Sequence, residues 1–232
     1  MATNREIFDA IAPTWYGVRH WPLLQRELET LAERWQHGRV ANLGCGTGAD
    51  FLPFARDFEL AGLDFSRGML REAQRHTAKH GVGATLVQAD LTHLPFADSS
   101  FDHAIGIACY HHIQGERERQ LALGELQRIL RPGGEAFLSV WNYAQPRFQA
   151  MPQDQTVPWH SGGVTLSRYY HLFTRDEFAE VLQQGGFEIV RLGYGTRRNA
   201  DSEEDTRNIC ALVRRPRDAE RPSTNSRSAE RG

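Results

Sequence analysis

The sequence of 232 residues predicts an α/β fold in which seven strands form a mostly parallel sheet with helices on both faces. From residue 40 onward, short apolar runs alternate with amphipathic segments, the pattern of successive βαβ units. The first run, 40–43, leads directly into three glycines at alternate positions, Gly44, Gly46 and Gly48. Acidic residues follow the next two runs. A chain of this length suits one such domain without covalent links.

The periodicity places the elements one after another along the chain. We expect strands at 40–43, 58–64, 84–89, 104–108, 136–141, 187–192 and 208–213. Helices are expected at 50–56, 66–80, 116–130 and 174–184, with Ser66 and Thr174 as N-caps. The segment Arg131-Pro-Gly-Gly134 should form a turn before the fifth strand.

Three further segments frame this core, which we predict to be one domain, 1–213. Residues 1–38 should form two helices, 3–11 and 21–36, the first ending before Pro13. The aromatic-rich segment between them, 13–22, either packs its rings on the core or forms a lid. Residues 142–173 carry three prolines and little periodicity, so we interpret them as a loop inserted after the fifth strand. The arginine-rich tail, 214–232, contains no large apolar residue and should be disordered.

Composition excludes several classes of site. The net charge of −2 gives no overall sign of a polyanionic partner, although a local patch could still bind one. Cys45, Cys109 and Cys210 lie far apart, which argues against a zinc site or a disulfide framework and indicates a reducing compartment such as the cytoplasm. No apolar run approaches the ~20 residues of a membrane span. We therefore expect no metal, no membrane and no DNA as partners.

The glycine-rich turn is typical of a site for an adenosine-containing cofactor. Glycine permits positive φ and lets the backbone lie against a ligand, while the following helix offers free N–H groups to an anion. The spacing Gly-x-Gly-x-Gly differs from the Gly-x-Gly-x-x-Gly of dinucleotide folds and favours S-adenosylmethionine. An ordinary glycine-rich turn is the alternative. Cys45 lies within the turn and belongs to the predicted site.

Residues at the strand ends supply the rest of the predicted cofactor site, because ligands bind outside the carboxyl ends of parallel strands. Asp64, followed by Phe65, should accept hydrogen bonds from the ribose hydroxyls. Asp90 should accept from the adenine amino group, with Leu91 against the ring. Ile107 should lie beneath the methionine part. Each acid could instead be an ordinary surface residue. Asn42 stands where many such proteins carry an acid, so its contact should be weaker or merely structural.

His111 and His112 follow the fourth strand and should face the opening of the site. Adjacent side chains diverge and no third ligand is evident, so the pair does not indicate a metal. We expect one histidine to pack and the other to face the substrate.

Together, the glycine-rich turn, Asp64, Asp90-Leu91 and Leu130-Arg-Pro-Gly-Gly134 resemble the class I S-adenosylmethionine-dependent methyltransferases, whose sheet is Rossmann-like. A narrower resemblance covers nearly the whole chain up to the tail. It is similar to the tRNA methyltransferases that esterify carboxymethyluridine at the wobble position, a family that includes the methyltransferase half of the human alkB-homologue tRNA enzyme. The segments that carry it are 8–13, 21–22, 107–112, 116–119, 140–141, 157–159 and 168–173.

The narrower resemblance implies an acceptor pocket lined by Arg19, His111, Trp141, Arg168 and Tyr169. Arg19, His111 and Arg168 are the candidates for catalysis, and Trp141 and Tyr169 bind substrate with the two arginines. It also implies tRNA as substrate and a small zinc-binding activator protein as a partner. The chain departs from the family at Asn208-Ile-Cys210, where the family has Asn-Trp-Trp, and in its shorter insertion before Arg168. A small-molecule methyltransferase and a non-catalytic cofactor- or RNA-binding module are the alternatives.

Overall fold

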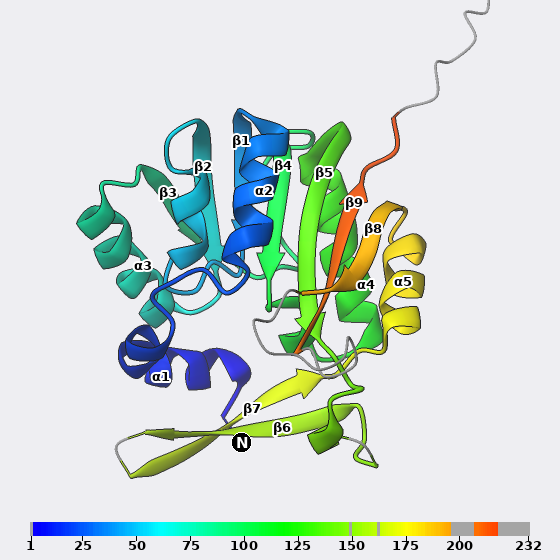
Figure 1. The fold of residues 1–232 in the computed structure, drawn as a ribbon. Coiled ribbons are helices and arrows are strands. Elements are labelled where there is room, and N and C mark those ends of the chain that lie inside the picture. Colours follow the sequence, from blue (N-terminus) through cyan, green and yellow to red (C-terminus); the bar gives the residue numbers. More distant parts are fainter. Residues whose placement is uncertain (1, 149, 162, 196–206, 218–232) are drawn as a thin grey trace, which may run out of the picture.

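The computed structural model describes residues 2–148, 150–161, 163–195 and 207–217. A seven-stranded sheet runs in the order β3-β2-β1-β4-β5-β9-β8 (Figure 1). Its strands are β1 Gly38–Leu43, β2 Phe58–Asp64, β3 Ala84–Gln88, β4 Phe101–Ile107, β5 Leu130–Trp141, β8 Glu188–Tyr194 and β9 Asn208–Arg214. The pairs β5–β9 and β8–β9 are antiparallel and the other pairs are parallel. The α/β, Rossmann-like prediction is confirmed.

Helices cover both faces of this sheet, as expected of a parallel arrangement. They are α1 Asn4–Val18, α2 Gln25–Trp35, α3 Arg67–His80, α4 Glu116–Ile129 and α5 Arg175–Gln184, with short 3-10 helices at η1 Ala49–Phe54, η2 Tyr110–His112 and η3 Pro146–Phe148. In Figure 1, α2 lies in front of the sheet and α4 behind it. Successive residues of β1 therefore enter different clusters: Val40 packs with α2, whereas Ala41 packs with α4 and α5.

Two N-caps were predicted correctly. Ser66 Oγ accepts from the Met69 amide at 3.1 Å and begins α3. Thr174 begins α5 with a reciprocal capping box to Glu177.

The N-terminal helix continues through Pro13, so the prediction that it stops there is wrong. Pro13 removes the N–H that would bond to the Asp9 carbonyl, and its ring crowds that carbonyl. The loss is offset by packing on both sides of it, because Ile11 is buried against α3 and Trp15 packs edge-on against Phe8 at 5.9 Å. The second helix begins at residue 25, later than predicted.

The segments 49–54 and 131–134 also differ from prediction. Residues 49–54 form a 3-10 helix in place of an α-helix, closed by bonds such as Phe51 N–H to the Gly48 carbonyl. The expected turn at 131–134 lies within β5, where the register against β4 is irregular. Backbone bonds to Arg215 hold that segment: Gly133 donates to its carbonyl, and its amide donates to Gly134.

The inserted segment 142–173 is not a plain loop. It contains β6 Asp154–Ser161 and β7 Val164–His171, which pair as an antiparallel hairpin below the main sheet (Figure 1). Pro158 lies opposite Ser167 in this two-stranded unit. A proline is compatible with such an edge position, because one side of each strand needs no ladder hydrogen bonds. The prolines therefore concealed a strand.

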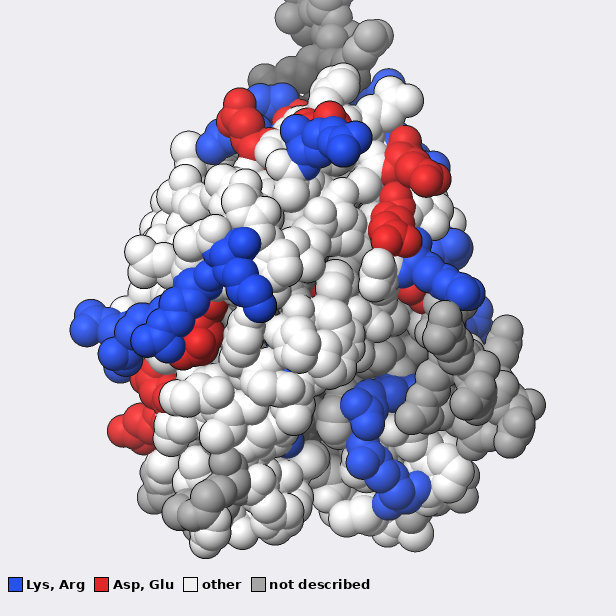
Figure 2. Space-filling model, turned by 60° about the vertical axis from the view of Figure 1, so that its left-hand side comes forward, with Lys and Arg blue, Asp and Glu red and all other residues white. Residues whose placement is uncertain are grey.

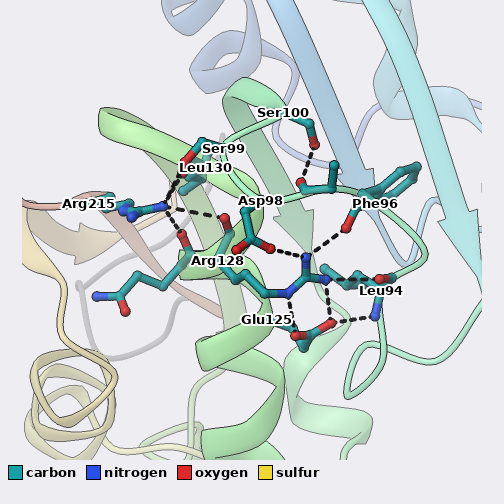
Figure 3. Close-up of polar contacts among 11 residues, drawn as sticks. Leu94, Phe96, Asp98, Ser99, Ser100, Glu125, Arg128, Leu130 and Arg215 are labelled. Carbon is teal, nitrogen blue, oxygen red and sulfur yellow. Dashed lines mark hydrogen bonds and ion pairs between the residues drawn. The ribbon is translucent and has the colours of Figure 1, made fainter.

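The predicted tail begins too early, because Arg214 belongs to β9 and Arg215 is anchored. Figure 3 shows Arg215 donating to the Ser99 hydroxyl and the Leu130 carbonyl, next to Arg128. Arg128 in turn bonds with Glu125, Asp98 and the carbonyls of Leu94 and Phe96. These contacts fix the loop 92–100. Residues 218–232 lie outside the described part of the chain.

No helix in the described residues is long and apolar enough to cross a membrane. The same part of the chain contains no group of three or more histidine, cysteine or acidic side chains placed to hold a metal ion.

Candidate functional site

A cavity of about 820 Å³ opens at the carboxyl ends of the parallel strands. This volume lies within the range of ligand pockets. Its walls come from the glycine-rich turn, the ends of β2 and β4, the end of α1, and the β6–β7 hairpin. Most of the predicted site residues meet here: Gly44, Cys45, Gly46, Asp64, Phe65, Asp90, Leu91, Ile107, His111, Trp141, Arg19 and Arg168.

The first two glycines shape the cavity and the third does not reach it. Gly44 has φ +64°, and a Cβ there would lie 2.6 Å from Cys109 Cβ. Gly46 has φ +52° and faces open space. Gly48 also has positive φ, but it faces Ala73 on α3 and does not line the cavity. Its positive φ serves the turn itself, and its predicted contact with the cofactor stays a prediction.

Asp64 ties the turn to the end of β2. Its Oδ2 accepts from the Gly46 amide and its Oδ1 from the Ser66 amide, both at 2.9 Å. The side chain is nearly buried, and burial raises the pKa of Asp64 to about 6 in spite of these bonds. A carboxylate oxygen can accept two hydrogen bonds, so each oxygen retains capacity for a ligand hydroxyl.

The end of β3 provides a second acid with an apolar neighbour. Asp90 Oδ1 accepts from the amide and hydroxyl of Thr92 at 2.9 and 2.8 Å. Asp90 and Leu91 both line the cavity, and buried Ile107 borders it from β4. The glycine cradle, two acids and apolar walls together fit S-adenosylmethionine. Asn42 does not line the cavity, and its buried amide has no hydrogen-bond partner among the described residues.

Arg168 dominates the opposite end of the cavity. Its guanidinium carbon lies 5.2 Å from the ring centroids of Trp15, Trp159 and Tyr170. The residue is 4% exposed, and Nε has no hydrogen-bond partner in the described part of the chain. Burial lowers the pKa of Arg168. No ion pair joins it to an acid among the described residues, so a positive charge faces the cavity without a counter-ion.

Arg19, in contrast, already has an acidic neighbour. Its guanidinium lies 3.8 Å from Asp50 Oδ2, and its carbonyl accepts from the Thr47 hydroxyl at 2.7 Å. These contacts hold the end of α1 against the glycine-rich turn. Trp15 and Trp21, from the segment 13–22, line the cavity, and Trp15 also packs against Phe8 and Trp159. Both the packing and the lid interpretations of this segment therefore stay predictions.

Both histidines line the cavity, His111 as a buried side chain and His112 as a half-buried one. The expectation that one packs and the other faces the substrate stays a prediction. His111 Nδ1 accepts from the Trp141 amide at 3.2 Å, and its ring stacks on Tyr170. His112 Nδ1 donates to the Tyr169 carbonyl at 3.0 Å. Burial lowers the pKa of His111 far below its ordinary value and that of His112 to about 3. Both rings are therefore neutral at pH 7.

Tyr169 does not line the cavity, so this prediction is wrong. Side chains alternate along a strand, and β7 directs Arg168 and Tyr170 inward. Tyr169 instead donates from its hydroxyl to Asp154 at 2.6 Å. The presence of Arg168 in a strand would have indicated Tyr170, two positions later.

Other cavity residues were missed because they come from distant segments. Trp15 belongs to α1, and Arg147 and Arg207 lie 5.0 and 5.3 Å from the Trp141 ring centroid. No local pattern marks either arginine.

The methyltransferase domain family matches residues 40–134. A protein of Encephalitozoon cuniculi named "Putative methyltransferase" is 32% identical over 182 residues, with 75% of this chain and 81% of that protein covered. A tRNA (carboxymethyluridine(34)-5-O)-methyltransferase of Schizosaccharomyces pombe is 27% identical, with 82% of this chain and 90% of that enzyme covered. The chain spans 32% of the length of some other curated relatives.

The fold is also similar to a chain in the solved complex between the Haloferax volcanii Trm112 methyltransferase activator and a methyltransferase. The TM-score is 0.68 at 18% identity, with 94% of this chain and 100% of that chain covered. This likeness shows the fold alone. The family match includes the glycine-rich turn, and the chain covers 81% of the Encephalitozoon cuniculi protein. The chain therefore belongs to the S-adenosylmethionine-dependent methyltransferases.

Proposed function

We propose that this enzyme methylates a carboxylate, and that the carboxylate belongs to a carboxymethyl-modified uridine at the wobble position of tRNA. The observation that carries the proposal is Arg168, a buried cation that faces the cavity without an acidic partner in the described residues. A buried charge is costly unless a ligand pairs with it. Arginine also binds carboxylates bidentately.

The state of the two histidines supports a carboxylate acceptor. A carboxylate is already ionised at neutral pH, so its methylation needs no proton removal. His111 accepts the Trp141 amide at Nδ1 and is deeply buried, and His112 uses Nδ1 for the Tyr169 carbonyl. Their proposed role is to shape and dry the pocket. His111, Arg19 and Arg168 remain the candidates for catalysis, acting through orientation and exclusion of water.

The cofactor half is assigned in the same proposal. When bound, S-adenosylmethionine supplies an electrophilic methyl group on a sulfonium. Asp64 would accept from the ribose hydroxyls and Asp90 from the adenine amino group, with Leu91 and Ile107 against the apolar parts. Gly44, Cys45, Gly46 and Phe65 complete this wall of the cavity.

Support for tRNA comes from the relatives and from charge. The Schizosaccharomyces pombe relative is named for the wobble carboxymethyluridine. Arg147 and Arg207 line the cavity together with Arg168, and Figure 2 shows basic side chains beside a cleft in the lower part of the molecule. Arginines suit phosphates, and Trp159 offers a ring for an unstacked base. The Trp141 ring already has two guanidinium groups within 5.3 Å of its centroid, which favours an indirect role.

The test compares wild type with Arg168→Gln on tRNA that carries unmethylated carboxymethyluridine. We expect Arg168→Gln to keep its affinity for S-adenosylhomocysteine within about twofold. Its kcat/KM for tRNA should fall about 100-fold, because two charge-assisted hydrogen bonds are lost. Arg39→Gln is a matched control, since Arg39 lies away from the cavity. Equal transfer by Arg168→Gln and wild type would reject the assignment.

A small carboxylic acid is the second candidate acceptor, because Arg168 is buried in a box formed by the rings of Trp15, Trp159 and Tyr170. A panel of free carboxylic acids, assayed beside tRNA with labelled cofactor, separates the two. Transfer to the acids alone would remove the tRNA proposal and keep the carboxylate chemistry.

The proposal includes a small activator protein, by analogy with the Haloferax volcanii complex. Co-expression with such an activator should raise the amount of active enzyme. If that amount does not change, the proposed partner is rejected. A cytoplasmic location is also proposed, in keeping with three buried free cysteines.

A further inference from the structure

Asp9, on α1, lies outside the cavity wall but reaches the cofactor half through two hydrogen bonds. Its Oδ1 accepts from the Ser66 hydroxyl at 2.7 Å and from the Gly68 amide at 2.8 Å. Ser66 is fully buried, and its own amide donates to Asp64 Oδ1 at 2.9 Å. One side chain of α1 thus fixes the residue that holds Asp64 in place.

The approach of α1 to this point is close enough to require a glycine. Gly68 has no positive φ, yet a Cβ there would lie 2.8 Å from the Asp9 carbonyl oxygen and 2.9 Å from Ala12 Cβ. Both distances are shorter than any normal contact. The contact between α1 and the start of α3 is therefore specific, and it positions Asp9 over the N-terminus of α3.

Asn4, the first residue of α1, reaches the acceptor half in a similar way. Its Oδ1 accepts from the Tyr169 amide at 2.8 Å, and its Nδ2 donates to the Tyr169 carbonyl at 3.2 Å. Nδ2 also donates to the His112 carbonyl at 3.2 Å. The side chain therefore pairs with β7 much as a neighbouring strand would. Tyr169 is the residue between Arg168 and Tyr170, which both face the cavity.

We propose that α1 sets the geometry of both halves of the cavity through two positioning residues, Asp9 for the cofactor half and Asn4 for the acceptor half. Figure 1 shows α1 below the sheet, with α3 above it and the hairpin below. A carboxylate or a guanidinium must be held within a fraction of an ångström to act on its ligand. The Asn4 part rests on the proposed function, whereas the Asp9 part needs only cofactor binding.

The experiment separates the roles of Asp9 and Asn4 by using different readouts. Calorimetry measures the affinity of Asp9→Ala, Asp9→Asn and Asn4→Ala for S-adenosylhomocysteine, and KM is measured for the tRNA acceptor. Hydrogen exchange is followed over 164–171. Asn at position 9 keeps an Oδ1 that can accept both bonds. Glu6→Ala is the control, because Glu6 belongs to the capping box of α1 and touches neither half.

We expect Asp9→Ala to weaken binding of S-adenosylhomocysteine about tenfold, whereas Asp9→Asn should stay within about threefold. Asn4→Ala should leave that affinity unchanged, raise the KM for tRNA about tenfold and speed exchange in β7. Glu6→Ala should change neither ligand parameter. Where Asp9→Ala does not fold, Ser66→Ala removes one of the same two bonds and should weaken S-adenosylhomocysteine several-fold.

Three outcomes would overturn the proposal. They are equal losses in Glu6→Ala, unchanged cofactor affinity in Asp9→Ala, or unchanged exchange of β7 in Asn4→Ala. If wild type does not methylate tRNA, the proposed function fails, but calorimetry and hydrogen exchange still decide the roles of Asp9 and Asn4.

Discussion

Substituting Asp64 by asparagine should make the protein more stable and less able to bind its cofactor. Burial raises the pKa of this carboxyl from 3.8 to about 6. Each pKa unit corresponds to about 1.4 kcal/mol, so holding Asp64 ionised at pH 8 costs the native state about 3 kcal/mol. Asparagine removes the charge but can accept only with Oδ1, so one of the two amide partners is lost. We expect a net gain of about 1–2 kcal/mol at pH 8.

The raised pKa of Asp64 also determines how the free energy of unfolding changes with pH. Between about pH 4 and 6 the native state binds a proton at Asp64 more tightly than the unfolded chain does, so the native state loses stability as the pH rises through this window. Asp64→Asn lacks that dependence. The stability difference between variant and wild type should therefore be large at pH 8 and smaller at pH 5. Urea unfolding followed by tryptophan fluorescence measures it at both values.

Cofactor affinity provides the second half of the test. Loss of a charged acceptor for two ribose hydroxyls should weaken S-adenosylhomocysteine about 100-fold at pH 8. The affinity of wild type should also decrease as the pH falls below 6. A stability difference that does not change with pH would refute the burial argument, and unchanged affinity in Asp64→Asn would refute the assignment to ribose.

Three further substitutions test the packing and the corrected site. A Cβ at Gly62 would lie 2.4 Å from Phe51 Cζ, so Gly62→Ala should lower the free energy of unfolding by about 1–3 kcal/mol, whereas Gly83→Ala, with open space around it, should not. Hydrogen bonds from Arg34 lower the pKa of Glu135 to about 2. The stability that this carboxylate contributes is therefore present above about pH 4.5 and lost toward pH 2. In urea titrations, Glu135→Gln should cost about 2 kcal/mol at pH 7 and little at pH 2. Tyr169→Phe should leave kcat/KM for the acceptor within about twofold, because its hydroxyl lies outside the cavity; a large loss would restore this residue to the pocket.

The centre of the sheet was predictable because strands such as β1, β2 and β4 are largely buried and contain short apolar runs. The helix starts at Ser66 and Thr174 were predictable because a capping side chain is a local signal. Pro13 misled because its cost is also local, whereas the contacts that outweigh it come from α3 and Phe8. The hairpin 154–171 was missed for the same reason, since its prolines are visible and its pairing is not.

The two halves of the site differ in the same way. Asp64 and Ile107 end their strands and Asp90 comes just after one, and the topology of a parallel sheet brings such positions together. No topological rule predicts the box of rings around Arg168, because Trp15 and Trp159 meet only through the packing of α1 on the hairpin. The family resemblance identified Arg168 as a pocket residue. The alternation of side chains along β7 then explains why Tyr170 lines the cavity and Tyr169 does not.

The distribution of these walls along the chain affects how the protein can be altered. The proposed cofactor contacts fall within residues 44–107, whereas the box around Arg168 joins Trp15 to a hairpin about 150 positions later. During synthesis, the residues of the proposed cofactor contacts therefore precede those of the hairpin. In engineering, a hairpin taken from another enzyme could redirect the methyl group, provided that it presents to Asn4 the same backbone amide and carbonyl.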